Sequence, residues 1–283
     1  MKLARLGPLG AETPAVLHRG VYYDLSGLTP TIDGDFLENG GIDRVRAALG
    51  SLPALANAES LRVGSPIARP SAVICIGQNY AAHARESGSE PPANPIIFLK
   101  TPNTVVGAND AVRIPRGSTK TDWEVELGVV IGARASYLDS PADSRAHIAG
   151  YVVANDVSER SFQMEVSGGQ WSKGKSAPGF SPLGPWLVTA DEVDAQSLGL
   201  RSWVNGEPRQ NSSTADMIFS VDHLVWDLSQ YLTLEPGDVI LTGTPQGVAF
   251  GGLFPYLRDG DVVEIEIDGL GRQRQVFTAW DAS

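Results

Sequence analysis

The chain has 283 residues, of which 42% are apolar and 19% charged, and its formal net charge is −11. This composition is typical of a globular protein with room for one large domain and a small extension. The acidic balance opposes attraction to phosphate backbones, and no apolar run approaches the roughly 20 residues that span a bilayer, so we expect neither nucleic acid nor a membrane as a partner.

Residues 1–68 predict a small N-terminal domain with its linker. KLARLG predicts a strand, AVLHRGVYYDLSG a hairpin and IDRVRAALG an amphipathic helix. Residues 51–71 are rich in Pro, Ser and Ala with little periodicity, which predicts a linker. The N-terminus has no apolar segment of the secretory type, so the expected location is the cytoplasm.

Residues 69–283 predict a second domain of short β-rich runs separated by Gly and Pro. Asn205-Gly206 predicts a type I′ hairpin turn, and the segment 235–238, Glu-Pro-Gly-Asp, fits a type II turn. Amphipathic spacing predicts a helix over Val221–Tyr231, and a short helix is expected over residues 79–87. The expected strands are 73–76, 96–99, 112–114, 124–131, 151–155, 186–188, 200–204, 239–242 and 262–267. The pattern predicts an α+β, mostly β fold and excludes a doubly wound nucleotide-binding fold.

Cys75 is the single cysteine, which excludes an intrachain disulfide and a thiolate metal cluster. It lies in the apolar run AVICIG, which predicts a small buried side chain.

The segment TDWEVELGVVIG contains two carboxylates on one face of a strand. Residues at i and i+2 share a face, so Glu124 and Glu126 point the same way, and the opposite face is wholly apolar. Two like charges held away from water raise each other's pKa unless a cation compensates. A solvated sheet edge with two surface glutamates is the alternative.

A third carboxylate, Asp156, ends the buried run AGYVVAND. Three hard oxygen ligands without a nearby His or Cys favour Mg²⁺ or Mn²⁺, with Ca²⁺ also possible, over zinc. An octahedral ion would keep about three positions for water or substrate. This favours a catalytic site over a structural Ca²⁺ site, which remains the alternative.

On the short helix beginning near Asn79, His83 and Glu86 are three positions apart and lie side by side. A carboxylate beside an imidazole orients it and raises its basicity, giving a general base for water. A surface ion pair is the alternative interpretation.

The stretch GQWSKGKS, residues 169–176, matches the P-loop pattern in letters only. No apolar strand precedes it, and Pro178 and Pro182 forbid a continuous helix after it, so nucleotide binding is rejected. Lys175 is left as a loop cation able to stabilise a carboxylate or a developing oxyanion. An ordinary exposed loop lysine is the alternative.

Taken in order, these segments resemble the fumarylacetoacetate hydrolase family. The matching stretches are ICIGQNYAAHARE, PIIFLK, DWEVELGVVIG, GYVVANDVSER, GQWSKGKS, LGPWLVT, VNGEPRQ, LEPGDVILTGTPQGV and GDVVEIEIDGLG. The resemblance implies a mixed β-roll, usually a homodimer, with Mg²⁺ or Mn²⁺ on Glu124, Glu126 and Asp156. It implies that His83 and Glu86 activate water.

The resemblance also implies roles for further residues. Lys175 is expected in catalysis, and Gln78, Tyr80, Gln163 and Thr244 in binding a small keto-acid substrate. The implied activity is hydrolysis of the C3–C4 bond of a 2,4-dioxo acid with release of pyruvate. Oxaloacetate decarboxylation and isomerisation of 2-hydroxyhepta-2,4-dienedioate are the alternatives.

Among the branches of the family, the chain is most similar to hydrolases of 2,4-dioxo-3-deoxy sugar acids. It departs from them after Lys175, where residues 177–180 read Ala-Pro-Gly-Phe in place of an Asp-Thr-Phe-like run.

Overall fold

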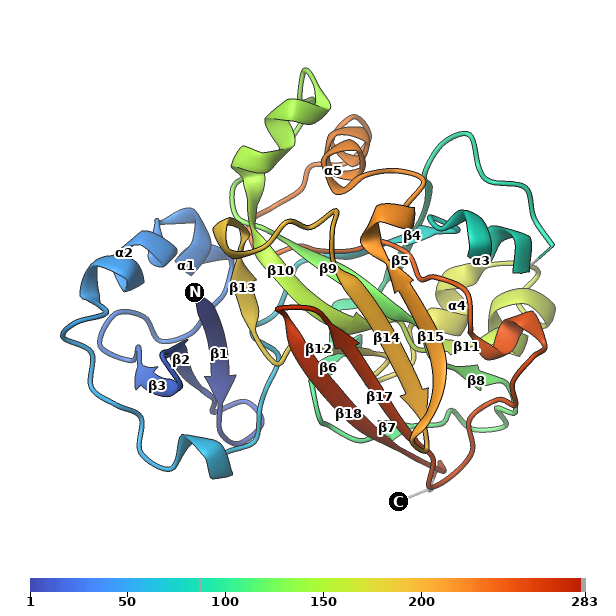
Figure 1. Cartoon of the computed structure of the whole chain (residues 1–283), viewed down its shortest axis with the longest axis horizontal. Helices are drawn as coiled ribbons and strands as arrows, with labels where there is room; N and C mark the ends of the chain where they lie inside the picture. Colours follow the sequence, from blue (N-terminus) through green and yellow to red (C-terminus); the bar gives the residue numbers. More distant parts are fainter. Residues whose placement is uncertain (87, 281–283) are drawn as a thin grey trace.

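The computed structural model describes residues 1–86 and 88–280, and most of their regular secondary structure is β-strand (Figure 1). Among these residues the largest sheet has eleven strands, nine of them in the order β3-β2-β1-β13-β10-β9-β16-β4-β5, with β12 beside β10 and β6 beside β12. Its strands are β1 Lys2–Leu6, β2 Thr13–His18, β3 Val21–Asp24, β4 Val73–Gly77, β5 Ile96–Lys100, β6 Val105–Gly107, β9 Val125–Ile131, β10 Ile148–Asn155, β12 Ser181–Leu183, β13 Leu187–Thr189 and β16 Val239–Leu241.

A second sheet, in the order β15-β14-β17-β18-β7, packs against the first (Figure 1). Its strands are β7 Val112–Arg113, β14 Gly199–Val204, β15 Glu207–Ser213, β17 Val262–Ile267 and β18 Gly271–Thr278. Burial alternates along β14 and β17, as expected of strands with one face on a core. Leu200 and Ile265 from this sheet share a core with Leu127 and Val153 of the first. A two-stranded pair, β8 Thr121–Asp122 with β11 Ser158–Glu159, completes the β structure.

The other face of the large sheet is covered by the N-terminal helices. Phe36 of α1 (Gly34–Glu38) and Val45 of α2 (Gly41–Ala48) pack in a core with Val130 and Val152. The central strands are therefore buried on both faces, and every residue of β9 and β10 is buried. This explains their nearly continuous apolar sequences.

The remaining helices are short. They are α3 Ala81–Glu86, α4 Trp171–Lys175 and α5 Val221–Ser229. Short 3₁₀ segments are η1 Ala58–Ser60, η2 Pro102–Thr104, η3 Pro141–His147, η5 Ala190–Glu192, η6 Thr214–Asp216 and η7 Ala249–Gly251, and η4 Ser161–Glu165 is a short π-helix. Ser220 caps α5 by accepting a hydrogen bond from His223 N–H. The predicted continuation of this helix to Tyr231 is wrong, because the helix ends at Ser229 and Tyr231 is 74% exposed.

The predicted α+β, mostly β class is confirmed, and each expected strand has a counterpart within three residues. Glu124 lies just before β9 rather than in it. The Asn205-Gly206 turn joins β14 to β15 with positive φ at both residues, as its sequence predicts. The expected strands did not include β15 and β18, whose residues EPRQNSS and GRQRQVFT are largely polar, nor the short strands β6, β8, β11 and β12. The predicted hairpin turn was the one sign of β15. The helix expected over residues 79–87 is α3, and residue 87 lies outside the described residues.

The N-terminal region is continuous with the main sheet, because β1 pairs antiparallel with β13. Residues 51–71, predicted as a linker, contain only η1 as a regular element, and they run alongside β1 through hydrogen bonds such as Gly64 N–H to the Arg5 carbonyl at 2.8 Å. The division at residue 68 stays a prediction.

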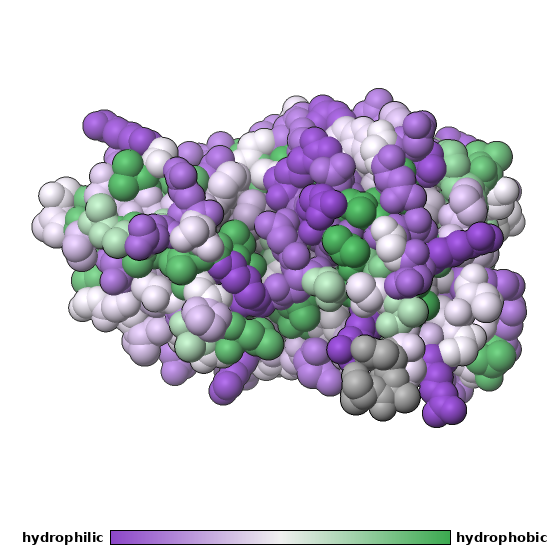
Figure 2. All heavy atoms as spheres, turned by 90° about the horizontal axis from the view of Figure 1, so that it is seen from below, coloured by the Kyte–Doolittle hydropathy of each residue, from purple (hydrophilic) through white to green (hydrophobic). Residues whose placement is uncertain are grey.

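The face seen in Figure 2 mixes polar and apolar side chains, with apolar residues in small groups between polar ones. No helix of the described chain is long and apolar enough to cross a membrane.

Candidate metal and substrate site

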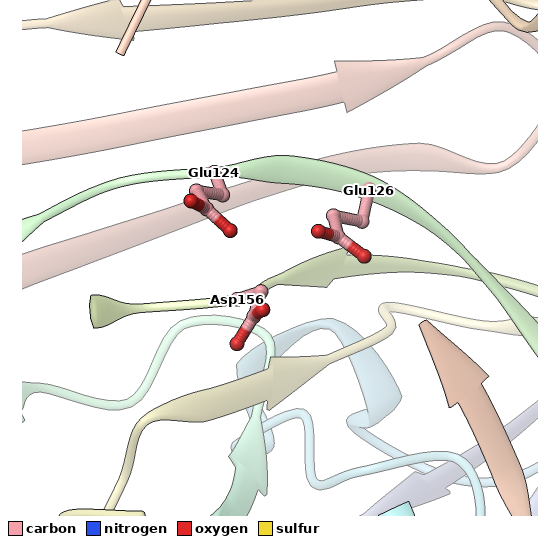
Figure 3. A group of neighbouring side chains, drawn as sticks. All are labelled: Glu124, Glu126 and Asp156. Carbon is pink, nitrogen blue, oxygen red and sulfur yellow. The ribbon is translucent and has the colours of Figure 1, made fainter. Parts of the chain in front are cut away.

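Three carboxylates meet where β9 begins and β10 ends. Glu124 precedes β9, Glu126 is its second residue, and Asp156 follows β10. The strands are antiparallel, and the Asp156 N–H donates to the Glu124 carbonyl at 3.0 Å. One oxygen from each carboxylate lies within 4.8 Å of the others, and none of the three residues is more than 4% exposed. Figure 3 shows Glu124 and Glu126 projecting from the same side of their strand, beside Asp156.

Three buried cations bond to two of these carboxylates. Lys175 Nζ lies 2.7 Å from both Glu124 Oε2 and Asp156 Oδ2. Arg160 donates to Glu124 Oε1 at 2.5 Å, and the Lys100 ammonium bonds to Asp156. Burial alone would raise the pKa of Glu124, but Lys175 and Arg160 bring it below its ordinary value.

Glu126 has a different environment. It accepts a hydrogen bond from Gly243 N–H at 2.8 Å, and no cation of the described residues lies within ion-pair distance of its carboxylate. Burial raises its pKa well above the ordinary value, and the charges of Asp156 and Glu124 add to the effect. A bound cation would remove this electrostatic penalty.

The donor set fits a hard divalent cation. All three side chains offer carboxylate oxygens, the ligands that Mg²⁺, Mn²⁺ and Ca²⁺ prefer. The buried carboxylate of Glu126 lacks a compensating charge, and a divalent ion supplies one.

His83 and Glu86 form a pair on α3. His83 Nδ1 lies 3.2 Å from Glu86 Oε2. Glu86 is fixed from the other side by Gly247 N–H, which donates at 3.0 Å to Oε1. Gly251 also packs closely, since a Cβ there would lie 2.5 Å from Glu86 Cγ. The loop that follows β16 thus fixes the Glu86 carboxylate, which can orient the imidazole of His83.

A cavity of about 100 Å³ joins these groups. It is lined by the three carboxylates, His83 and Lys175, and by three of the four residues expected to bind substrate. Those three are Gln78, Gln163 and Thr244. Gln163 Oε1 accepts from Arg160, and Thr244 Oγ1 bonds to Gln210 and to the Val125 carbonyl.

Tyr80 is the exception among the expected substrate contacts. It is fully buried in the main core, does not line the cavity, and its hydroxyl has no hydrogen-bond partner among the described residues. Burial raises the pKa of its hydroxyl above the ordinary value. The structure therefore places Tyr80 behind the site, where it packs, and not on the cavity surface.

Sequence reasoning missed two of the cations. Lys100 ends β5 and also donates to the Phe180 carbonyl at 2.5 Å, so the divergent segment 177–180 helps to hold it. Arg160 follows β11 and bonds to Asp122, which in turn accepts from Ala249 N–H at 2.9 Å. The only sequence signal for Lys100 and Arg160 was their position at the end of a strand, in the stretches PIIFLK and GYVVANDVSER.

The segment 169–176 is not a phosphate loop. The helical turn η4 and not a strand precedes it, and its last residues form α4, where Lys175 faces the carboxylates. This agrees with the rejection of nucleotide binding.

Comparison with known proteins places the chain in a family. The model of the fumarylacetoacetate (FAA) hydrolase C-terminal domain matches residues 72–278. A Burkholderia multivorans protein named "Putative hydrolase" is 48% identical over 284 residues, covering 99% of both chains.

Solved structures agree over the same length. A fumarylacetoacetate hydrolase from Exiguobacterium antarcticum has a TM-score of 0.86 at 34% identity, covering 99% of this chain and 100% of that one. A 2-hydroxyhepta-2,4-diene-1,7-dioate isomerase from Mycobacterium marinum has a TM-score of 0.76 at 33% identity, covering 99% and 98%. A maleylpyruvate hydrolase from Sphingobium sp. SYK-6, solved with manganese(II) and pyruvate, has a TM-score of 0.81 at 27% identity, covering 99% and 100%. The chain belongs to the fumarylacetoacetate hydrolase family, which contains both hydrolases and isomerases.

Proposed function

We propose that the protein is a metal-dependent hydrolase that cleaves the C3–C4 bond of a 2,4-dioxo acid and releases pyruvate. The observation that carries this proposal is that the carboxylate trio and His83, the imidazole of the His83–Glu86 pair, line one cavity. The trio suits a hard cation, and the pair suits activation of water.

Glu124, Glu126 and Asp156 would hold the cation, which we propose to be Mg²⁺ or Mn²⁺. When bound, it supplies Lewis-acid stabilisation to the carboxylate and 2-oxo oxygens of the substrate. The manganese in the similar maleylpyruvate hydrolase supports this choice.

His83 would act as the general base. Oriented by Glu86, its imidazole takes a proton from water, and the hydroxide oxygen bonds to C4 of the substrate. Lys175 and Gln163 line the same cavity and would stabilise the oxyanion that forms on the C4 oxygen. The C3–C4 bond then breaks and C4 leaves as a carboxylic acid. C3 takes up the proton that His83 removed from water, which completes the methyl group of pyruvate and restores the neutral imidazole.

Isomerisation of 2-hydroxyhepta-2,4-dienedioate or decarboxylation of oxaloacetate is the second candidate. The M. marinum isomerase, 33% identical, favours it. The His83–Glu86 pair favours hydrolysis, because neither alternative requires activated water.

The test is an assay of the purified protein with Mg²⁺ or Mn²⁺ against acylpyruvates, 2,4-dioxo-3-deoxy sugar acids, oxaloacetate and 2-hydroxyhepta-2,4-dienedioate. Loss of the diketone absorbance with equimolar formation of pyruvate is expected for the first two classes. Turnover of only oxaloacetate or the dienedioate would replace the proposal with the second candidate.

We also propose that the protein is a homodimer, as its family resemblance implies. Light scattering coupled to size-exclusion chromatography tests this, with a mass of twice 30.1 kDa expected.

A further inference from the structure

The outer part of the cavity is lined by apolar side chains that the proposed reaction does not use. Phe98 of β5 and Trp171 of α4 meet edge to face, with ring centroids 5.5 Å apart. Met164 of η4 also lines the cavity and is 41% exposed, whereas the carboxylates at the other end are at most 4% exposed. The cavity therefore runs from a buried charged end to an apolar mouth.

The position of Trp171 depends on Gly77 at the end of β4. A Cβ on Gly77 would lie 2.3 Å from Trp171 Cζ3, so the indole rests directly on the strand backbone. Since Gly77 also lines the cavity, the strand and the indole form one continuous wall. The mouth is thus a built apolar surface, which favours an apolar group of the substrate.

Both cations that line the cavity lie at its charged end. Arg160 bonds to Asp122, Glu124 and Gln163, and Lys175 bonds to Glu124 and Asp156. No other Lys or Arg of the described chain lines the cavity.

Aromatic rings cover one side of each cation. Phe98 lies 5.2 Å from Lys175 Nζ, and Phe250 lies 5.1 Å from Arg160 Cζ. A second substrate carboxylate at the mouth would therefore have no cation beside it, and burying an unpaired carboxylate is costly.

Hydroxyl groups on the substrate tail would also find few partners. Thr244 Oγ1 is bonded to Gln210 and to the Val125 carbonyl, and Gln78 Nε2 donates to Ser89 Oγ at 3.0 Å. A polyhydroxylated tail would therefore replace only part of its lost hydration, through groups such as Gln78 and Ser89 that already bond to each other.

We propose that the substituent at C4 of the substrate is a short, uncharged alkyl or aryl group that packs on Phe98, Trp171 and Met164. This proposal rests on the proposed C–C hydrolysis. It narrows the substrate to acylpyruvates and excludes dicarboxylic and sugar-derived 2,4-dioxo acids.

The test compares kcat/KM for four substrates that share the 2,4-dioxo acid head. They are 2,4-dioxoheptanoate, 2,4-dioxo-4-phenylbutanoate, the dicarboxylate 2,4-dioxoheptanedioate and 5,6-dihydroxy-2,4-dioxohexanoate. The alkyl and aryl compounds are expected to exceed the other two by about 100-fold, because those two bring polar groups to an apolar mouth. Preference for the dicarboxylate or the diol would overturn the inferred apolar substituent and leave the proposed hydrolysis standing. Cleavage of none of the four overturns the proposed hydrolysis.

Two variant pairs locate the preference in the mouth. Trp171→Ala is expected to lower the ratio of kcat/KM for the phenyl compound to that for acetylpyruvate by about tenfold. Trp280→Ala, which removes a 49% exposed indole that does not line the cavity, should leave the ratio unchanged. If the ratio of kcat/KM values is the same in both variants, Trp171 does not form the wall on which the C4 substituent packs.

The second pair adds a cation. Met164→Arg is expected to raise kcat/KM for the dicarboxylate about tenfold relative to 2,4-dioxoheptanoate, since it supplies the missing partner. Val166→Arg, two residues away, 74% exposed and not lining the cavity, is the matched control. No change in the first variant, or the same gain in both, contradicts the charge argument.

Discussion

The molecule contains two charged clusters that differ in balance. In the N-terminal cluster, Arg5, Glu12, Arg62 and Asp110 alternate in sign, and both carboxylates contact a guanidinium. In the site cluster four buried carboxylates face three cations. The carboxylates are Asp122, Glu124, Glu126 and Asp156, and the cations are Lys100, Arg160 and Lys175.

The comparison separates a structural ion network from a cation site. Opposite charges in equal number satisfy one another, so the N-terminal cluster needs no ligand. In the site cluster Glu126 is left without a cation, and its raised pKa records the penalty. A surplus of buried carboxylates that the fold itself creates is a stronger sign of a bound cation than the number of acidic residues.

Glu126→Gln gives the largest expected effect, because it removes the carboxylate that is in surplus. We expect the affinity for Mg²⁺ or Mn²⁺, measured by calorimetry, to fall at least about 100-fold. The melting temperature without metal should stay the same or rise, since a buried like charge has been removed. Glu264→Gln, on the half-buried face of β17, is the control and should bind metal normally. Unchanged affinity in Glu126→Gln would show that this residue is not a ligand.

His83→Ala tests the catalytic use of the same cavity. Hydrolysis of an acylpyruvate should fall by about 10² to 10⁴ in kcat, because the general base is lost. Metal affinity should be retained and any oxaloacetate decarboxylation largely spared. His18→Ala, on β2, is the control. Equal loss of both activities would mean that His83 does not act mainly on water.

Glu12→Gln breaks the balanced cluster. The Glu12 side chain is 4% exposed and accepts charge-assisted hydrogen bonds from Arg5 at 2.8 Å and Arg62 at 2.9 Å. The substitution removes the negative charge and so weakens both bonds. We expect a loss of about 2 kcal/mol of stability, or roughly 5 °C in melting temperature, with metal affinity unchanged. A fall in metal affinity would mean that the two clusters are coupled.

The effect of Glu12→Gln should also depend on pH. Burial alone would raise the pKa of Glu12, but backbone N–H donors and the two guanidiniums bring it below the ordinary value of 4.5. A depressed pKa contributes stability above the ordinary value, and this contribution is lost as the pH falls through the folded-state pKa. The difference in melting temperature between wild type and variant should therefore be full at pH 7 and shrink below about pH 4. A constant difference would show that the charge of Glu12 is not responsible.

Arg46→Met gives the smallest expected effect. Arg46 on α2 pairs with Asp191 at 2.7 Å, but both side chains are about half exposed. Surface pairs of this kind contribute less than about 1 kcal/mol, so the melting temperature should change by no more than about 2 °C. A larger shift, measured by calorimetric scanning, would mean that this contact holds the N-terminal helices to the main sheet.

Local sequence patterns were enough for the features that depend on periodicity. The alternation around Glu124 and Glu126 placed both carboxylates on one face, and the spacing of His83 and Glu86 placed them side by side on one helix. Asn205-Gly206 determined its turn, because both residues tolerate positive φ. Resemblance to a family then joined these separate pieces into one site.

Tertiary structure alone decided the electrostatics and the shape of that site. Lys100 and Arg160 reach Asp156 and Glu124 across 56 and 36 residues of chain, and no local pattern encodes such contacts. Tyr80 faces the core although Gln78 and His83, two and three positions away, line the cavity. β15 and β18 pair despite their polar sequences, because backbone hydrogen bonds and the neighbouring strands stabilise them. The surplus charge at Glu126 and the apolar mouth of the cavity exist only once distant segments are packed together. Burial and pairing are properties of the fold and not of any short stretch of sequence.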